Sequence, residues 1–118
     1  MTHITKIAGL TVAAAALMAG LSAPAAAQSF DCRDSTVKAE RAVCGSDRLS
    51  DLDERMSSLY DRLIDATPGV RGREQVRSYQ RQFLAARNAC GGDKSCIKGA
   101  YQDQISVLQA RVRTARYE

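Results

Sequence analysis

The sequence has few of the residues that catalysis and cofactor binding use most. It contains one histidine, His3, no tryptophan, two phenylalanines and four tyrosines. If the N-terminal segment is removed, as argued below, no imidazole remains. That excludes Ser–His–Asp and Cys–His catalysis, and zinc or haem bound through histidine. A hydrophobic content of 45% with 25% charged residues is ordinary for a folded chain, so 118 residues predict one small domain.

The N-terminal segment has the features of a secretory signal peptide. Lys6 precedes an uncharged, mainly apolar run over residues 7–21, and residues 23–27 offer a small-residue cleavage site. The run is short for a membrane-spanning helix, which needs about 20 residues, so cleavage near Ala27 is favoured over an uncleaved anchor. We expect a signal peptide over 1–27, a domain over 28–118 that carries a charge of about +3, and a periplasmic or secreted protein.

Two further absences bear on how the protein meets a membrane. No second long apolar run follows residue 27, so no transmembrane anchor is expected after cleavage. Phe30 and Asp31 precede Cys32, where a bacterial lipoprotein needs a Leu-x-Gly/Ala run. We therefore expect no lipid anchor.

All four cysteines lie in the expected mature chain, at Cys32, Cys44, Cys90 and Cys96. An even number in a short exported chain is typical of structural disulfides, and the spacing fits neither a common zinc motif nor a CxxC redox motif. Local pairing, Cys32–Cys44 and Cys90–Cys96, is favoured because short loops close easily. A crossed pairing that joins Cys44 to Cys90 stays open, since two antiparallel helices would bring them together.

The remaining sequence is amphipathic at helical spacing, and no alternating β-branched run suggests a strand. A short helix is expected over about residues 36–43. Three longer helices each carry apolar residues at steps of three and four. Their inward positions are Leu49, Leu52, Met56, Leu59 and Leu63, then Val76, Tyr79, Phe83, Ala86 and Cys90, then Ile97, Tyr101, Ile105, Leu108 and Val112.

Caps and breaks separate these helices. Ser50 with Asp53, or Asp47 or Ser46 one turn earlier, is expected to cap the first long helix, and Asp93 or Ser95 the last. Pro-Gly at 68–69 and Gly-Gly at 91–92 end the helices before them. The sequence thus predicts an all-α fold, a small up-down bundle of three to four helices stapled by two disulfides.

Several elements together resemble a known family. They are Phe30-Asp31-Cys32, Thr36, Glu40, Cys44, Leu49-x-x-Leu52-Asp53, Tyr60, Gln80-x-x-Phe83-Leu84-x-x-Arg87-x-x-Cys90, Asp93-x-x-Cys96-Ile97 and Tyr101. This pattern resembles the N-terminal domain of LprI-type lysozyme inhibitors, from Phe30 to about Leu108. The chain departs from it at Phe83, where the family usually has Trp, and at Gln104, often Arg.

The resemblance implies an exported helical domain that binds and inhibits a lysozyme, with a protein as its partner. The lack of histidine and the cysteine spacing lead us to expect no cofactor and no metal. An inhibitor can present a donor to the two carboxylates of a lysozyme cleft. The loops at the cysteine end offer Asp47, Arg48, Asp93 and Lys94, although acids there also serve as helix caps. Many lysozymes are basic, so a net positive inhibitor gains no long-range attraction unless local acidic patches compensate.

Other residues carry alternative interpretations. Arg87 either binds a ligand carboxylate or, as we prefer, clamps an internal acid such as Glu40 or Asp53. The tyrosines at 60, 79 and 101 are expected at the core edge, with their hydroxyls in water.

Arg73, Arg77 and Arg81 share one helix face and suit an anionic partner, or form a solvated face beside Glu74. The alternative function is therefore a non-catalytic envelope module that binds an anionic partner or another periplasmic protein. A weaker one is a purely structural domain. Export and the lack of interleaved aromatics argue against nucleic acid. A small bundle core leaves no room for an ordinary substrate cavity, so no enzyme is expected.

Overall fold

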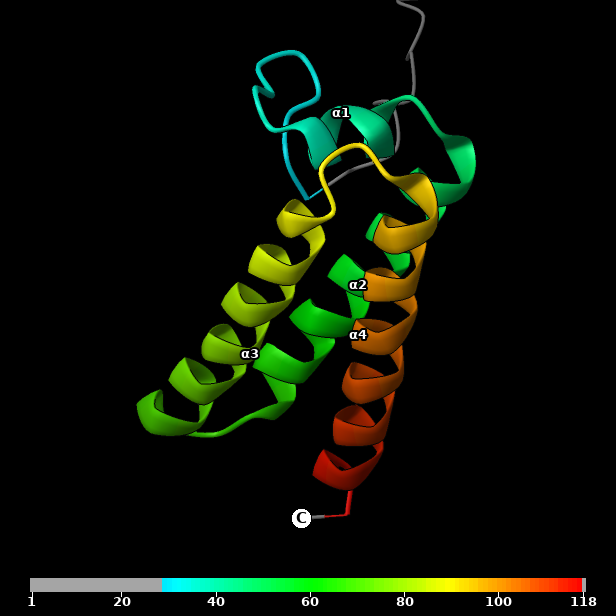
Figure 1. The fold of residues 1–118 in the computed structure, drawn as a ribbon. Coiled ribbons are helices and arrows are strands. Elements are labelled where there is room, and N and C mark those ends of the chain that lie inside the picture. The colour runs from blue at the N-terminus through cyan, green and yellow to red at the C-terminus, as the bar shows by residue number, and fades with distance from the viewer. Residues whose placement is uncertain (1–28, 118) are drawn as a thin grey trace, which may run out of the picture.

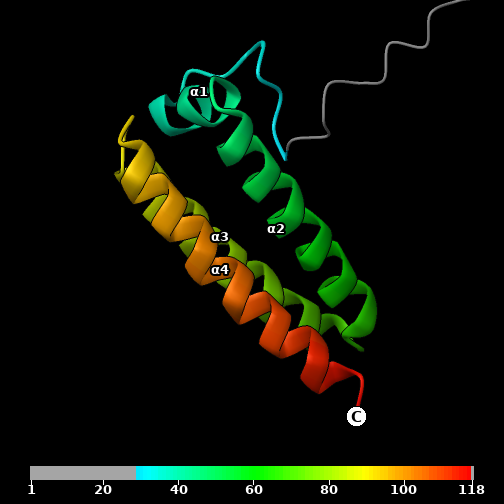
Figure 2. The same ribbon diagram turned by 90° about the vertical axis from the view of Figure 1, so that its right-hand side faces the viewer.

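The computed structural model describes residues 29–117, and within them the chain forms four helices and no strand. Helix α1 spans Lys38–Cys44, α2 Asp47–Ala66, α3 Val70–Ala89 and α4 Lys94–Ala115. The three long helices run alternately up and down, and α1 lies across the end where α2 and α4 begin (Figures 1 and 2). The predicted all-α bundle is confirmed. The proposed signal peptide and its cleavage site lie outside the described residues.

Side-chain caps set the starts of α2 and α4. Ser46 caps α2, where its side chain accepts a hydrogen bond from the Leu49 amide, and Asp93 caps α4 by accepting one from the Cys96 amide. Ser50 instead donates its hydroxyl proton to the Val43 carbonyl oxygen at 2.8 Å. The predictions of a Ser50 cap and of an Asp47 cap are therefore wrong, and the Ser46 alternative is correct. Helix α1 begins two residues later than predicted, because Val37 is in extended conformation.

The apolar stripes of the three long helices meet in one core, with α2 packed most extensively against α4. Every predicted inward position of α4 is buried, whereas α3 differs from prediction at its C-terminal end. Ala86 is exposed there, and Arg87 faces inward with 1% of its surface exposed. A charged side chain thus occupies the place predicted for a small apolar one, because partners from other helices neutralise it. Among the described residues, no helix is both long and apolar enough to span a lipid bilayer.

Two disulfides, Cys32–Cys44 and Cys90–Cys96, hold one end of the bundle. The first ties the segment before α1 to the last residue of α1. The second closes the turn between α3 and α4, where Gly91 has the positive φ of 58° that glycine tolerates best. The local pairing is confirmed, and the crossed pairing is wrong. We call this the disulfide end.

Candidate functional site

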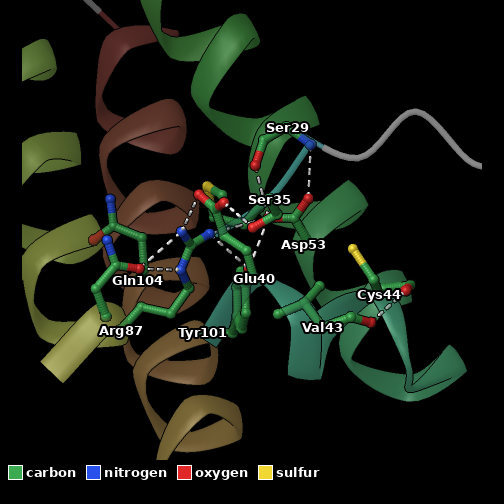
Figure 3. Close-up of polar contacts among 12 residues, drawn as sticks. Ser29, Ser35, Glu40, Val43, Cys44, Asp53, Arg87, Tyr101 and Gln104 are labelled. Atoms are coloured by element: carbon green, nitrogen blue, oxygen red, sulfur yellow. Dashed lines mark hydrogen bonds and ion pairs between the residues drawn. The ribbon is translucent and has the colours of Figure 1, made fainter. Parts of the chain in front are cut away.

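A cluster of charged side chains lies in the core beneath the disulfide end (Figure 3). Asp53 of α2 is fully buried, and the Tyr101 hydroxyl of α4 donates to its Oδ1 at 2.7 Å. From α3, Arg87 donates through Nη1 to the Tyr101 hydroxyl oxygen at 3.2 Å, and this nitrogen lies 4.0 Å from Asp53 Oδ1. Its Nη2 reaches Glu40 Oε1 of α1 at 3.2 Å. The cluster joins all four helices.

The segment before α1, residues 29–36, closes the cluster from outside, and we call it the strap. The Ser29 amide donates to Asp53 Oδ2 at 2.8 Å, and the Ser29 hydroxyl donates to Oδ1 at 2.9 Å. The ring of Phe30 lies 5.2 Å from the guanidinium carbon of Arg87. Among the described residues, no buried side-chain nitrogen or oxygen lacks a hydrogen-bond partner. The strap therefore completes the polar core.

The electrostatics of the cluster make Tyr101 a fixed hydrogen-bond donor. Burial raises the pKa of its hydroxyl far above the usual 10.0, and the Asp53 charge and its hydrogen bond raise that pKa further. The hydrogen bond and the charge of Arg87 act weakly in the opposite direction. The phenol consequently stays protonated at physiological pH. The prediction that this hydroxyl reaches water is wrong, because Asp53 and Arg87 are buried beside it and bind it.

The structure explains Arg87 as an internal clamp. Its guanidinium binds Glu40 and lies beside Asp53, the two acids that the sequence suggested, and it also donates to the side-chain oxygen of Asn88 at 3.0 and 3.1 Å. The clamp is confirmed. Direct contact of Arg87 with a partner stays a prediction, and it concerns a side chain that is almost completely enclosed.

The four predicted contact residues at the disulfide end are brought together as two pairs. Asp47 and Arg48 begin α2, and Asp93 and Lys94 stand at the start of α4, all four exposed. Both helices start at this end of the bundle (Figure 1). The two pairs thus share one end of the molecule, where the disulfides limit the motion of the backbone.

The arginines of α3 form a separate face that is partly neutralised. Arg81 lies 2.8 Å and Arg77 3.8 Å from carboxylate oxygens of Glu74, and Arg73 donates to the Thr67 carbonyl oxygen at 3.3 Å. Arg73 lies in the first turn of α3, at the end of the bundle away from the disulfides. The structure does not join this face to the residues at the disulfide end.

A side pocket escaped the sequence analysis. It lies between α2 and α3, has a volume of about 340 Å³, and is bordered by the strap. Its walls combine residues up to 58 positions apart in the chain, from Ser29 to Arg87. No local pattern predicts such a juxtaposition. Within residues 29–117, no three metal-binding side chains gather into a site.

Comparison with known proteins adds the family. The family model described as lysozyme inhibitor LprI matches residues 32–117, which include all four helices and both disulfides. The chain is also similar to Lipoprotein LprI of Mycobacterium bovis and of two Mycobacterium tuberculosis strains, with 28% identity over 102 residues in each case. These matches cover 84% of this chain and 50% of each relative, so the chain spans about half the length of the curated relatives it matches. No solved structure matches. By the family match, the chain belongs to the LprI lysozyme inhibitor family.

Proposed function

We propose that this protein inhibits a lysozyme by docking onto it, without catalysis, in the cell envelope or outside the cell. The observation that carries the proposal is the family match, which extends over the whole bundle rather than over one motif. The lipoprotein names of the relatives support an envelope location. The charged cluster supports a non-catalytic role, because its acids, its arginine and its phenol are all engaged with one another.

The disulfide end is the proposed docking surface. Arg48 and Lys94 are exposed there and can donate hydrogen bonds to the two carboxylates of a lysozyme cleft. The flanking acids, Asp47 and Asp93, can pair with cations at the rim of the cleft. Because disulfides and caps already fix the backbone at this end, docking loses little conformational entropy.

The test is inhibition of several lysozyme types by the oxidised, purified chain over residues 28–118. We expect at least one type to be slowed at a stoichiometric excess of the chain. Replacing both Arg48 and Lys94 by alanine should weaken that inhibition about a hundredfold or more, since each lost charge-assisted bond is worth about 1.5 kcal/mol, or roughly tenfold. The matched control replaces Arg71 and Arg116, which are exposed at the opposite end, and should change inhibition less than about twofold. If no lysozyme is slowed or bound, the proposed function is wrong.

A second candidate is an envelope module that binds an anionic partner through the arginine face of α3. One observation favours it: Arg73, Arg77 and Arg81 have a single acid, Glu74, among their ion-pair partners, so the face keeps a surplus of positive charge. Replacing all three arginines by glutamate should abolish binding to anionic lipid vesicles without loss of helical content. Binding that survives this charge reversal would rule the face out.

A further inference from the structure

The proposed docking end leaves unused a side pocket that lies between α2 and α3, beside the charged cluster. Helix α2 supplies one wall, α3 the opposite wall, and the strap and α1 close its upper edge. The volume is about 340 Å³. The residues around it are Ser29, Phe30, Glu40, Ser57, Tyr60, Asp61, Gln80, Leu84 and Arg87.

Negative charge is in surplus at this pocket. Asp53 lies in the cluster beneath it, and Glu40 and Asp61 line it, whereas Arg87 is the one cation of the cluster and the lining. Glu40 and Asp53 already share that guanidinium. Asp61 is exposed and has no ion-pair partner among the described residues. Three carboxylates against one guanidinium leave the pocket suited to a cation and unsuited to an anion.

The walls fit a long cationic side chain better than a small ion. The rings of Tyr60 and Phe30 and the side chain of Leu84 are half-buried and apolar, so they can cover the methylene stem of an arginine or lysine. An aromatic ring also attracts a guanidinium or ammonium group placed over its face. Phe30 already stacks in this way on Arg87. The volume is near the lower limit for ligand pockets, about 300 Å³, which suits one side chain rather than a polymer.

We propose that this pocket receives an arginine or lysine side chain of a basic protein partner, with the head group bound to Asp61. Under the proposed function, on which the identity of the partner rests, the partner is a basic lysozyme. The pocket then supplies the local negative charge that compensates for the net positive charge of the chain. It extends the docking surface from the disulfide end along the groove between α2 and α3.

Two variants test the pocket through different physical properties. Asp61→Asn removes the charge of the exposed carboxylate, and Ser57→Trp fills the space without a change of charge. Each has a matched control on α2 outside the pocket, Asp65→Asn and Ser58→Trp, at exposed positions. With the lysozyme that the chain inhibits, at about 0.15 M salt, we expect inhibition to weaken about tenfold in Asp61→Asn and further in Ser57→Trp. Both controls should stay within about twofold, and circular dichroism should show unchanged helical content in all four.

A second measurement separates the pocket from the identity of the partner. N-acetyl-arginine amide, titrated into the millimolar range, should shift the amide NMR signals of Asp61 and Gln80 saturably, and Ser57→Trp should abolish the shift. If the chain inhibits a lysozyme and both pocket variants inhibit as well as the unchanged chain, the pocket inference is overturned and the proposed function stands. If no lysozyme is bound, the proposed function fails, and the titration decides the pocket alone: a saturable shift supports it, and no shift overturns it.

Discussion

The buried ion cluster gives the sharpest prediction about stability, the loss of Arg87. Arg87→Met keeps much of the volume of the side chain but leaves the fully buried Asp53 without a cation. Removing one partner of a buried ion pair costs about 3–5 kcal/mol. At about 0.05–0.15 kcal/mol per residue, the described domain has a total stability of only about 4–13 kcal/mol. The variant should therefore be close to unfolded, or folded with a much lower urea midpoint.

The assay is urea unfolding of the oxidised protein, followed by far-UV circular dichroism. With a slope of about 1–1.5 kcal/mol per molar urea, the midpoint should fall by about 2–5 M. The matched control is Arg81→Met on the same helix. Its ion pair with Glu74 is short, 2.8 Å, but 61% of the arginine side chain is exposed, so the control should cost less than about 1 kcal/mol.

A double variant tests whether the unpaired charge causes the loss. Asp53→Asn removes the charge that Arg87→Met leaves behind, so the two changes together should cost at least about 1 kcal/mol less than the sum of their separate effects. Glu40 can turn toward water when its partner is lost, because 20% of its side chain is exposed. If Arg87→Met costs no more than Arg81→Met, or if the two changes are additive, the cluster does not stabilise the bundle as we infer.

Three further outcomes follow from the same contacts. The free energy of unfolding should fall as the pH rises above about 10, by up to about 1.4 kcal/mol per pH unit, because the Tyr101 hydroxyl keeps its proton in the folded state and loses it in the unfolded state. Urea unfolding, measured about one pH unit below and one above pH 10, should show a smaller fall for Tyr101→Phe than for the unchanged chain. Replacing Cys32 and Cys44 by alanine should lower the unfolding free energy by about 3 kcal/mol for a separation of 12 residues, and an equal midpoint with and without the bond would refute this. Asp93→Ala, which removes the cap of α4, should cost about 1 kcal/mol in the same urea assay, while Asp93→Asn should cost much less.

The helices were predictable because their signals are local. Steps of three and four place Ile105, Leu108 and Val112 on one side of α4 independently of the rest of the fold, and all three are buried. The caps at Ser46 and Asp93 are local as well, since each side chain binds an amide three residues ahead. Short loops likewise favoured the correct disulfides.

The cluster was predictable only in part because its partners are far apart in the sequence. Arg87 binds an acid 47 residues away, and Tyr101 binds one 48 residues away. The family pattern contained Glu40, Asp53, Arg87 and Tyr101, but a pattern does not say which side chains meet. Periodicity alone therefore misassigned Ala86, which is exposed, whereas the burial of Arg87 depends on the acids that neutralise it.

The position of the cluster bears on how a domain with so few aromatic residues presents a rigid surface. Ion pairs and hydrogen bonds join α1, α2, α3, α4 and the strap at one level of the bundle (Figure 3). Farther from the disulfides, the guanidinium carbon of Arg111 in the C-terminal part of α4 lies 4.0 Å from the ring centre of Tyr79 in the middle of α3. The end with the denser cross-linking is the end that we propose for docking, and the side pocket lies against it. Because ordered side chains and loops lose less entropy on binding, we expect the buried charges to favour tight association at the proposed docking surface.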